Sequence, residues 1–277
     1  MQLRGGGAQR WSTLRMEEVV EEITTACFSS PILFDESFFM LEMEDGQSCV
    51  AFTRKERSAD KDDLPLFVDD VWPGSKYLAK YIDKQCGASC FQGKCVLELG
   101  AGCALPSVVA SKLGANLTVA TDYPAANVIH TIEEVFAANR KSNSSTEGRV
   151  VAACLKWGDS QDEEMVRDLL PAGKDGFDAI LIAEPLWADT TSSHAHLARS
   201  VASLLSSEEG STAWLSFCHR PNDTHKPEHD LAFFDTARSL EGLRSELVTV
   251  CNDEYRDVDS ADDGPCIEVK LYTMTKS

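Results

Sequence analysis

The fold is indicated most clearly by the segment Cys95-Val96-Leu97-Glu98-Leu99-Gly100-Ala101-Gly102. An apolar strand-like run leads directly into Gly-x-Gly, and residues 107–113 then have helical spacing. Glycine has no Cβ and adopts positive φ, so the backbone at this turn can approach a ligand closely. In an open α/β sheet, ligands bind at the carboxyl ends of the strands. The stretch therefore predicts a cofactor site at the end of a central strand.

The residues around the two glycines distinguish between two classes of cofactor. A dinucleotide fold has a third glycine in G-x-G-x-x-G, but Leu105 occupies that position here and Pro106 follows it. The carboxylate of Glu98 would repel a pyrophosphate, whereas it can bind the α-ammonium of a methionine moiety. Asp122 ends the next strand, where an acidic side chain can accept hydrogen bonds from both ribose hydroxyls. These features favour S-adenosylmethionine over NAD.

The chain from residue 73 onward alternates short apolar segments with helical ones, which indicates a parallel sheet covered on both faces. We expect strands at 95–99, 117–121, 150–155, 179–183, 212–217, 247–251 and 266–273. We expect helices at 75–85, with Ser75 as N-cap, and at 107–113, 125–139, 163–170, 193–205 and 228–240. No helix separates the last two strands, so they should pair as an antiparallel hairpin. The predicted fold class is α/β, with a doubly wound, mostly parallel seven-stranded sheet.

The first part of the chain has a different pattern and predicts an N-terminal extension. A glycine-rich start is followed by helical spacing over 16–27, and two short strands are expected within 38–52 around Glu44-Asp45-Gly46-Gln47. The charged stretch 54–63 is typical of a solvated loop, as is the acidic stretch 252–264, which lacks the ligand order of an EF-hand. We expect an extension at 1–68 and an S-adenosylmethionine-binding domain at 69–277.

Composition excludes several classes of protein. The net charge of −19 argues against a broad nucleic-acid surface; it suits a basic partner, and it serves solubility equally well. The ten cysteines are scattered, so we expect reduced and buried thiols; Cys86, Cys90 and Cys95 do not have the spacing of a zinc site, and no metal is expected. The chain has no secretory signal and no apolar window long enough to span a membrane. These features predict a cytoplasmic protein that does not contact membranes.

A set of motifs within residues 69–240 resembles those of one known family. The motifs are Val71-Trp72-Pro73-Gly74-Ser75, Leu97 to Gly102, Thr121-Asp122-Tyr123, Asn139, Trp157-Gly158, Phe177-Asp178, Leu181 to Trp187, and Ser216 to Pro221 with Phe233-Phe234. They are similar to motifs of the seven-β-strand protein lysine methyltransferases (methyltransferase family 16). The last set resembles the nicotinamide N-methyltransferase-like branch, which includes methyltransferases of elongation factor 1A. The resemblance implies an S-adenosylmethionine-dependent enzyme with a basic protein substrate, and elongation factor 1A is the substrate most implied by this branch.

The resemblance also implies roles for particular residues. Catalytic roles fall on three side chains: Glu184 orients the incoming amine, Trp187 forms an apolar or cation-π wall, and His219 accepts a proton or contacts substrate. Each has a simpler interpretation, namely charge complementarity at a helix N-terminus, core packing, and a loop-fixing hydrogen bond, respectively. The residues expected to bind the cofactor are Trp72, Glu98, Gly100, Ala101, Gly102, Asp122, Tyr123, Trp157 and Ala183.

This chain departs from the family pattern at two positions. Lys156 stands where the family often has Asp before Trp-Gly, although Asp159 can substitute for it. Glu184-x-x-Trp187 replaces Asp-x-x-Tyr, which keeps the acid but exchanges a phenol for an indole. We therefore predict a monomeric protein N-methyltransferase acting on lysine or an N-terminal amine. A small-molecule N-methyltransferase and a non-catalytic cofactor-binding module are the alternatives, and a dinucleotide oxidoreductase is a distant third.

Overall fold

The computed structural model describes residues 36–54, 71–140, 148–186, 188–219, 226–251 and 268–277. Residues Asp35–Ser277 form one compact unit. The predicted helix at 16–27 and the predicted loops at 54–63 and 252–264 lie outside the described residues, apart from Arg54. No helix in the described ranges is long and apolar enough to cross a membrane.

A seven-stranded sheet forms the centre of the described unit, with the strand order β5-β4-β3-β6-β7-β9-β8. Strands β3 to β7 pair with one another only in parallel, whereas β9 pairs antiparallel with both β7 and β8. The predicted fold class and its final antiparallel hairpin are therefore confirmed. The strands are β3 Cys95–Leu99, β4 Leu117–Asp122, β5 Arg149–Cys154, β6 Ala179–Ala183, β7 Thr212–Cys218, β8 Leu243–Cys251 and β9 Val269–Lys276.

The order of the strands locates the ligand-binding edge. From β3 the chain adds β4 and β5 on one side, and it then crosses to add β6 and β7 on the other. In doubly wound sheets, ligands bind outside the carboxyl ends of the two strands at which this reversal occurs. Those strands are β3 and β6, which are paired with Leu99 opposite Ile182.

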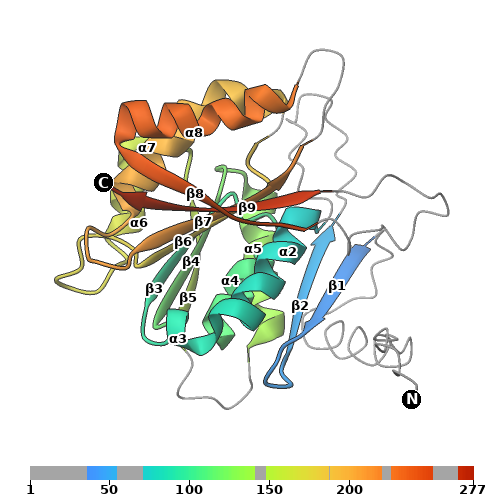
Figure 1. Cartoon of the computed structure of the whole chain (residues 1–277). Coiled ribbons are helices and arrows are strands. Elements are labelled where there is room, and N and C mark those ends of the chain that lie inside the picture. The colour runs from blue at the N-terminus through green and yellow to red at the C-terminus, as the bar shows by residue number, and fades with distance from the viewer. Residues whose placement is uncertain (1–35, 55–70, 141–147, 187, 220–225, 252–267) are drawn as a thin grey trace, which may run out of the picture. The chain divides into compact units, whose positions relative to one another are not determined.

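Helices cover both faces of the sheet. Helices α7 and α8 lie on one face, and α2, α4 and α5 lie on the other (Figure 1). Side chains of β3 alternate between the two faces: Leu97 and Leu99 belong to the core cluster shared with α7 and α8, whereas Glu98 points toward α4. The helices are α2 Pro73–Tyr81, α3 Gly87–Phe91, α4 Leu105–Lys112, α5 Ala126–Asn139, α6 Ser160–Arg167, α7 His194–Leu204 and α8 Pro227–Glu241.

The prediction that Ser75 caps the first helix is wrong. Helix α2 begins at Pro73, and Trp72 occupies the N-cap position. Proline fixes φ near the helical value and lacks an N–H, so it is favoured at the first helical position. Ser75 therefore lies inside the first turn and is buried. The helix continues as a π-helical turn, Ile82–Cys86, before α3.

Other predicted boundaries were displaced by up to four residues. Helix α4 starts at Leu105 because Pro106 fits the first turn, and α6 starts at Ser160 because Asp159 caps it by accepting hydrogen bonds from two backbone amides. Helix α7 follows a 3-10 turn, Ala188–Ser193. The predicted strands at 247–251 and 266–273 are β8 and β9, which pair as far as Leu243 opposite Lys276. Their pairing, rather than their apolar pattern, sets where they begin and end.

The predicted N-terminal hairpin is confirmed. Strands β1 Glu36–Glu42 and β2 Ser48–Arg54 pair antiparallel, and β2 lies against α5. Leu41, Met43 and Cys49 are buried, and the amide of Glu44 donates to Asp83 Oδ2 at 3.1 Å. The hairpin thus packs on the helical layer of the same compact unit. The domain boundary expected at residue 68 stays a prediction.

The described cysteines are free thiols, as expected: Cys49, Cys86, Cys90, Cys95, Cys103, Cys154, Cys218 and Cys251. The expectation that the thiols are buried is wrong for Cys154, which is exposed because it ends β5, a strand at the edge of the sheet. Cys86, Cys90 and Cys251 are partly exposed. Cys27 and Cys266 lie outside the part of the chain that the structure describes.

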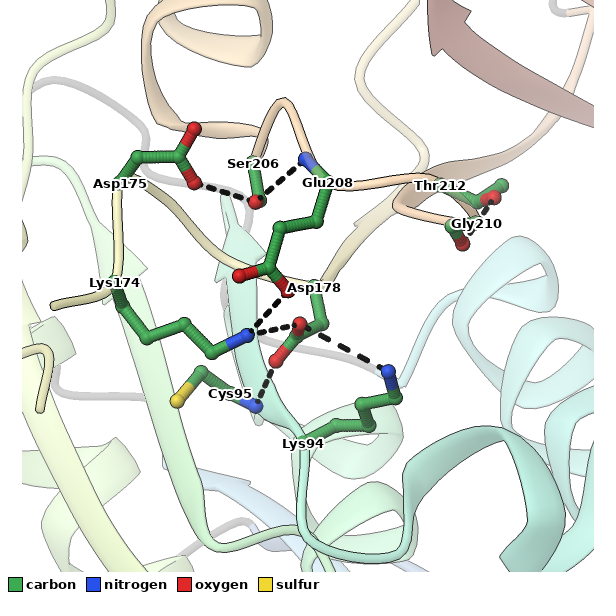
Figure 2. A network of polar contacts seen from close by, with 9 residues as sticks. All are labelled: Lys94, Cys95, Lys174, Asp175, Asp178, Ser206, Glu208, Gly210 and Thr212. Carbon is green, nitrogen blue, oxygen red and sulfur yellow. Dashed lines mark hydrogen bonds and ion pairs between the residues drawn. The ribbon is translucent and has the colours of Figure 1, made fainter.

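A polar network joins the amino-terminal ends of β3, β6 and β7, since the backbone of Asp178 is hydrogen-bonded to both Cys95 and Thr212. Figure 2 shows the side chains of this network. Asp178 is its centre: Oδ2 accepts a hydrogen bond from the amide of Cys95 at 2.8 Å, and Oδ1 lies 2.8 Å from Lys174 Nζ. Lys174 also binds Glu208 Oε2 at 2.8 Å, and these two carboxylates raise the pKa of its ammonium. Lys94 Nζ lies farther away, 3.9 Å from Asp178. The network holds the strands in register at the edge remote from the predicted site.

Replacing Asp178 by alanine is expected to lower the free energy of unfolding by about 1.5–3 kcal/mol, because the buried amide of Cys95 loses its charged acceptor. Urea denaturation checks this. The control is Lys94→Ala, which removes a half-exposed and distant partner of the same carboxylate and should cost less than about 1 kcal/mol. Equal losses for the two variants would contradict a central role for Asp178.

Candidate functional site

The loop after β3 has an unusual backbone that leaves one side uncovered. Gly100 and Gly102 have φ of 71° and 52°, and Ala104 is also left-handed, with φ of 53°. A Cβ on Gly102 would meet no atom within 4 Å, whereas one on Gly100 would lie 3.1 Å from Trp157 Cζ2. The two glycines therefore serve different purposes: Gly100 makes room for the indole, and Gly102 leaves bare backbone where a ligand can approach.

Asp122 holds this loop to the end of β4. Its Oδ2 accepts a hydrogen bond from Gly102 N at 2.8 Å, and its Oδ1 accepts one from Tyr123 N at 2.7 Å. Burial raises the pKa of Asp122, and these two amides act in the opposite direction. Each carboxylate oxygen keeps a second lone pair, which can accept a ribose hydroxyl. Tyr123 is 41% exposed, so its ring is accessible beside this carboxylate.

Glu98 is fully buried beneath the same loop. Its Oε2 accepts a hydrogen bond from Ser107 N at 2.9 Å, in the first turn of α4, while its Oε1 has no hydrogen-bond partner among the described residues. Burial raises the pKa of Glu98 to about 8; hydrogen bonds from Ser107 lower it, and the nearby Asp122 raises it. An unpaired buried oxygen costs about 1–3 kcal/mol. A cationic group that reached Oε1 would remove this cost and favour the ionised carboxylate.

Trp157 and Gly158 lie on the other side of the loop and are anchored by buried polar groups. Gly158 has φ of 78°, and a Cβ there would lie 2.9 Å from His196 Cβ. Its amide donates to Ser200 Oγ at 2.8 Å, and that hydroxyl donates to Glu163 Oε1 at 2.7 Å. Sequence reasoning missed Glu163 and Ser200, because each lies inside an ordinary amphipathic helix and no local motif marks it.

The structure places Trp72, Ala101 and Ala183, the remaining residues of the predicted cofactor set, at the same edge of the sheet. The amide of Ala101, between the two glycines, donates to Thr121 O at 2.9 Å. Trp72 is partly buried at the N-terminus of α2, and Ala183 ends β6 opposite Ser216. Asp159, the possible substitute for the family's acid, accepts hydrogen bonds from the amides of Gln161 and Asp162 and so caps α6. Its use as an adenine contact stays a prediction.

Glu184 follows β6 in a strained conformation and faces inward. Its φ is 55°, a value that costs a residue other than glycine about 1–3 kcal/mol, and it is 8% exposed. Its amide donates to Ser216 O at 2.7 Å, and Oε1 accepts a hydrogen bond from Gly74 N at 2.7 Å in the first turn of α2. Cys218 Sγ lies 3.4 Å from the same oxygen. These contacts match charge complementarity at a helix N-terminus, and the amine-orienting role stays a prediction.

His219 directly follows β7 and is held by an acid from α8. Its Nδ1 lies 2.7 Å from Asp230 Oδ2. The side chain of Asp230 is 0% exposed, and that of His219 is 14% exposed. The imidazole meets the ring of Phe217 edge-on, with 5.1 Å between centroids. Trp187 lies outside the described residues.

The described candidate residues gather at the carboxyl ends of four adjacent strands. Asp122 ends β4, the glycine loop follows β3, Glu184 follows β6 and His219 follows β7. Neighbouring strands are spaced by about 4.8 Å, so the end of β7 lies roughly 10 Å from the end of β3. The β4–β3 side has bare backbone and carboxyl groups suited to a nucleoside with an amino-acid tail, and the β6–β7 side has an acid and an imidazole. The residues on the first side therefore fit S-adenosylmethionine.

Comparison with known proteins identifies the family. Residues 66–239 match the family model described as lysine methyltransferase. A protein of Eremothecium gossypii named protein N-terminal and lysine N-methyltransferase EFM7 is 35% identical over 188 residues, which are 66% of each chain. A relative of the same name from Kluyveromyces lactis is 34% identical over 66% of this chain and 68% of its own length. Another from Schizosaccharomyces pombe is 31% identical over 66% of this chain and 67% of its own length. The match thus spans about two thirds of the length of these relatives.

A solved structure supports the fold independently. The crystal structure of SMU.776, described as a methyltransferase complexed with SAH, superposes with a TM-score of 0.51 at 16% identity. The superposition covers 89% of this chain and 57% of the SMU.776 chain. The match of residues 66–239 to the family model confirms the resemblance seen in the sequence. The chain belongs to the lysine methyltransferase family.

Proposed function

We propose that the protein is an S-adenosylmethionine-dependent N-methyltransferase that acts on lysine, on an N-terminal amine, or on both, in a protein substrate. The observation that carries the proposal is the uncovered backbone at Gly102, which Asp122 holds at the switch point of a lysine methyltransferase fold. Relatives that are 31–35% identical are named as protein N-terminal and lysine N-methyltransferases.

S-adenosylmethionine supplies a methyl group on a positively charged sulfur when it is bound. In the proposed site, Asp122 accepts hydrogen bonds from the ribose, Glu98 serves the α-ammonium, and the backbone of Gly100, Ala101 and Gly102 borders the ligand. Trp157 lies against Gly100, so its indole offers an apolar wall on that side of the loop. Trp72, Tyr123 and Ala183 complete the proposed set from the neighbouring strand and helix ends.

The acceptor amine would lie over the ends of β6 and β7. Methyl transfer needs an uncharged nitrogen held close to the methyl group, and positioning supplies much of the rate. Glu184 fixes the junction between β6 and α2 and places negative charge there, which favours the approach of a cationic side chain. For the acceptor amine, we propose that Trp187 supplies an apolar or cation-π contact and that His219 accepts a proton.

For the partner, we propose a basic protein, with elongation factor 1A as the first to test because the branch that this chain resembles includes its methyltransferases. The net charge of −19 suits a basic surface and opposes binding to nucleic acid. We propose that the enzyme works in the cytoplasm as a monomer. Fractionation of tagged protein and sedimentation of purified protein test these two points.

Radiolabelled S-adenosylmethionine incubated with the purified protein and a cell lysate tests the proposed function. We expect label in protein, and mass spectrometry of purified elongation factor 1A treated in parallel should find methyl groups on a lysine or on the N-terminal amine. Label confined to small metabolites would instead identify a small-molecule methyltransferase. Tight cofactor binding without any labelling would identify a non-catalytic module. Lysate without the added enzyme is the control.

A further inference from the structure

The pair formed by His219 and Asp230 is the strongest feature that family membership leaves unexplained. Nδ1 and Oδ2 are 2.7 Å apart, a short hydrogen bond of the charge-assisted kind. Asp230 lies in the first turn of α8, where the helix dipole favours a negative charge, and its side chain is completely buried. The hydrogen bond thus joins an ionisable ring at the site edge to a fixed acid behind it.

The arrangement leaves one ring nitrogen for another partner. The recorded contacts of the imidazole within the described ranges are with Asp230 and, edge-on, with Phe217, so Nε2 is not used by either. The side chain of His219 is 14% exposed. Other described histidines differ: His130 is exposed on α5 beside Glu133 and Glu134, and the Nδ1 of His229 accepts a hydrogen bond from the amide of Lys226 at 3.1 Å.

Two neighbours relate His219 to the acceptor side of the site. Cys218, the preceding residue, contacts Glu184 across the ends of β7 and β6 through its amide and its thiol. Side chains alternate along a strand, so Cys218 faces α2, whereas Phe217 and His219 face α8. His219 and Glu184 consequently flank the ends of the same strand pair, which is where the proposed function places the amine.

We propose that Asp230 is a positioning residue that holds His219 in the Nδ1–H tautomer, leaving Nε2 to accept the proton of the substrate ammonium before methyl transfer. This inference rests on the proposed function. In the step, an N–H bond of the ammonium breaks and an Nε2–H bond forms, which gives a neutral amine and an imidazolium paired with the Asp230 carboxylate. The amine lone pair then forms the N–CH₃ bond, and the S–CH₃ bond breaks with its electron pair passing to sulfur.

The pair predicts a particular tautomer of His219. The carboxylate of Asp230 only accepts hydrogen bonds, so the nitrogen that faces it, Nδ1, carries the proton and Nε2 keeps its lone pair. Asparagine also has a donor group, so Asp230→Asn should remove the preference for this tautomer and lower the rate. Asp230 from α8 is the carboxylate in contact with the ring, and Glu184 reaches the neighbouring Cys218 from the end of β6. A merely structural acid would not set the tautomer.

The test combines a spectroscopic with a kinetic measurement on the full chain. Long-range ¹H–¹⁵N correlation spectra of ¹⁵N-labelled protein report the tautomer of each histidine, and His219→Gln assigns the signal. Incorporation of radiolabelled methyl groups into lysate protein gives the rate. Calorimetry with S-adenosylhomocysteine and thermal unfolding confirm that the variants are folded. The matched controls are His130→Gln and Glu133→Gln, which remove members of the exposed histidine–carboxylate cluster on α5.

We expect the Nδ1–H tautomer in the wild type and its loss in Asp230→Asn, with a fall in kcat of about 10²- to 10⁴-fold for Asp230→Asn and His219→Gln. Affinity for S-adenosylhomocysteine and the two control variants should not change. An Nε2–H tautomer in the wild type, or an Asp230→Asn variant with the wild-type tautomer and rate, overturns the inference while the proposed function stands. A wild type that labels no protein overturns both. If Asp230→Asn does not fold, His219→Gln decides, since unchanged activity in that variant also overturns the inference.

Discussion

Asp122→Ala is expected to weaken S-adenosylmethionine binding by about 1.5–3 kcal/mol, or about 10- to 150-fold in Kd, which is the scale of hydrogen bonds to a charged group. Two effects act in the same direction. The ribose hydroxyls lose their proposed acceptor, and Gly102 N loses the carboxylate that holds the loop at 2.8 Å. The loop is then free to depart from the left-handed conformation that leaves its backbone uncovered.

Calorimetry with S-adenosylmethionine and with NAD on the wild type and the variant measures this effect. Asp235→Ala removes an equal charge from an exposed position on α8 and should bind like the wild type. Asp122→Asn keeps one acceptor oxygen and should lie between the two. A wild type that binds NAD and ignores S-adenosylmethionine would refute the cofactor assignment, and full affinity in Asp122→Ala would refute the role of this carboxylate.

Glu98→Gln is expected to remove much of the pH dependence of stability between pH 4.5 and about 8. In the folded protein, burial raises the pKa of Glu98 to about 8, whereas the unfolded chain ionises near the ordinary value of 4.5. Between these values the folded state binds more protons, so stability falls as the pH rises. At 1.36 kcal/mol per pH unit, the limiting loss is about 5 kcal/mol. Glutamine has the same shape and does not ionise.

Urea denaturation at a series of pH values compares the wild type with Glu98→Gln. The variant should gain stability relative to the wild type as the pH rises toward 8. Glu133→Gln, at a side chain that is 62% exposed, is the control and should follow the wild type. A slope that is the same in all three proteins would show that Glu98 is not the group responsible.

The same carboxyl group predicts a proton linkage in cofactor binding. If the α-ammonium reaches Glu98, it favours the ionised form, so binding near neutral pH should release a proton from the wild type but not from Glu98→Gln. The heat of binding in buffers of different ionisation enthalpy measures this release. Equal proton release in both proteins would show that the ammonium does not interact with Glu98.

The cofactor side was predictable because its chemistry lies in contiguous residues. A strand followed by Gly100-Ala101-Gly102, with an acid before it and another at the end of the next strand, specifies a turn and a ligand class by local geometry alone. The acceptor side was less predictable. Glu184 was identified from its motif, but the motif does not show its strained φ. Nor does it show the hydrogen bond from Gly74, which lies 110 positions away in the chain. Asp230 carried no signal, because an acid in the first turn of a helix is commonplace.

The amino-acid sequence was sufficient to predict the α/β class, the succession of strands and helices, the glycine loop and the lysine methyltransferase family, because hydrophobic periodicity, glycine and proline act on neighbouring residues. The partners of the polar side chains, in contrast, follow from the packing of distant segments. Ser216 Oγ donates a hydrogen bond to Gly74 O, 142 positions away in the chain. Glu98 accepts a hydrogen bond from Ser107 N in α4, and His219 contacts Asp230 of α8. These pairings depend on the order of the strands and on which face each side chain occupies. Both are properties of the packed sheet, and neither can be read from any single segment.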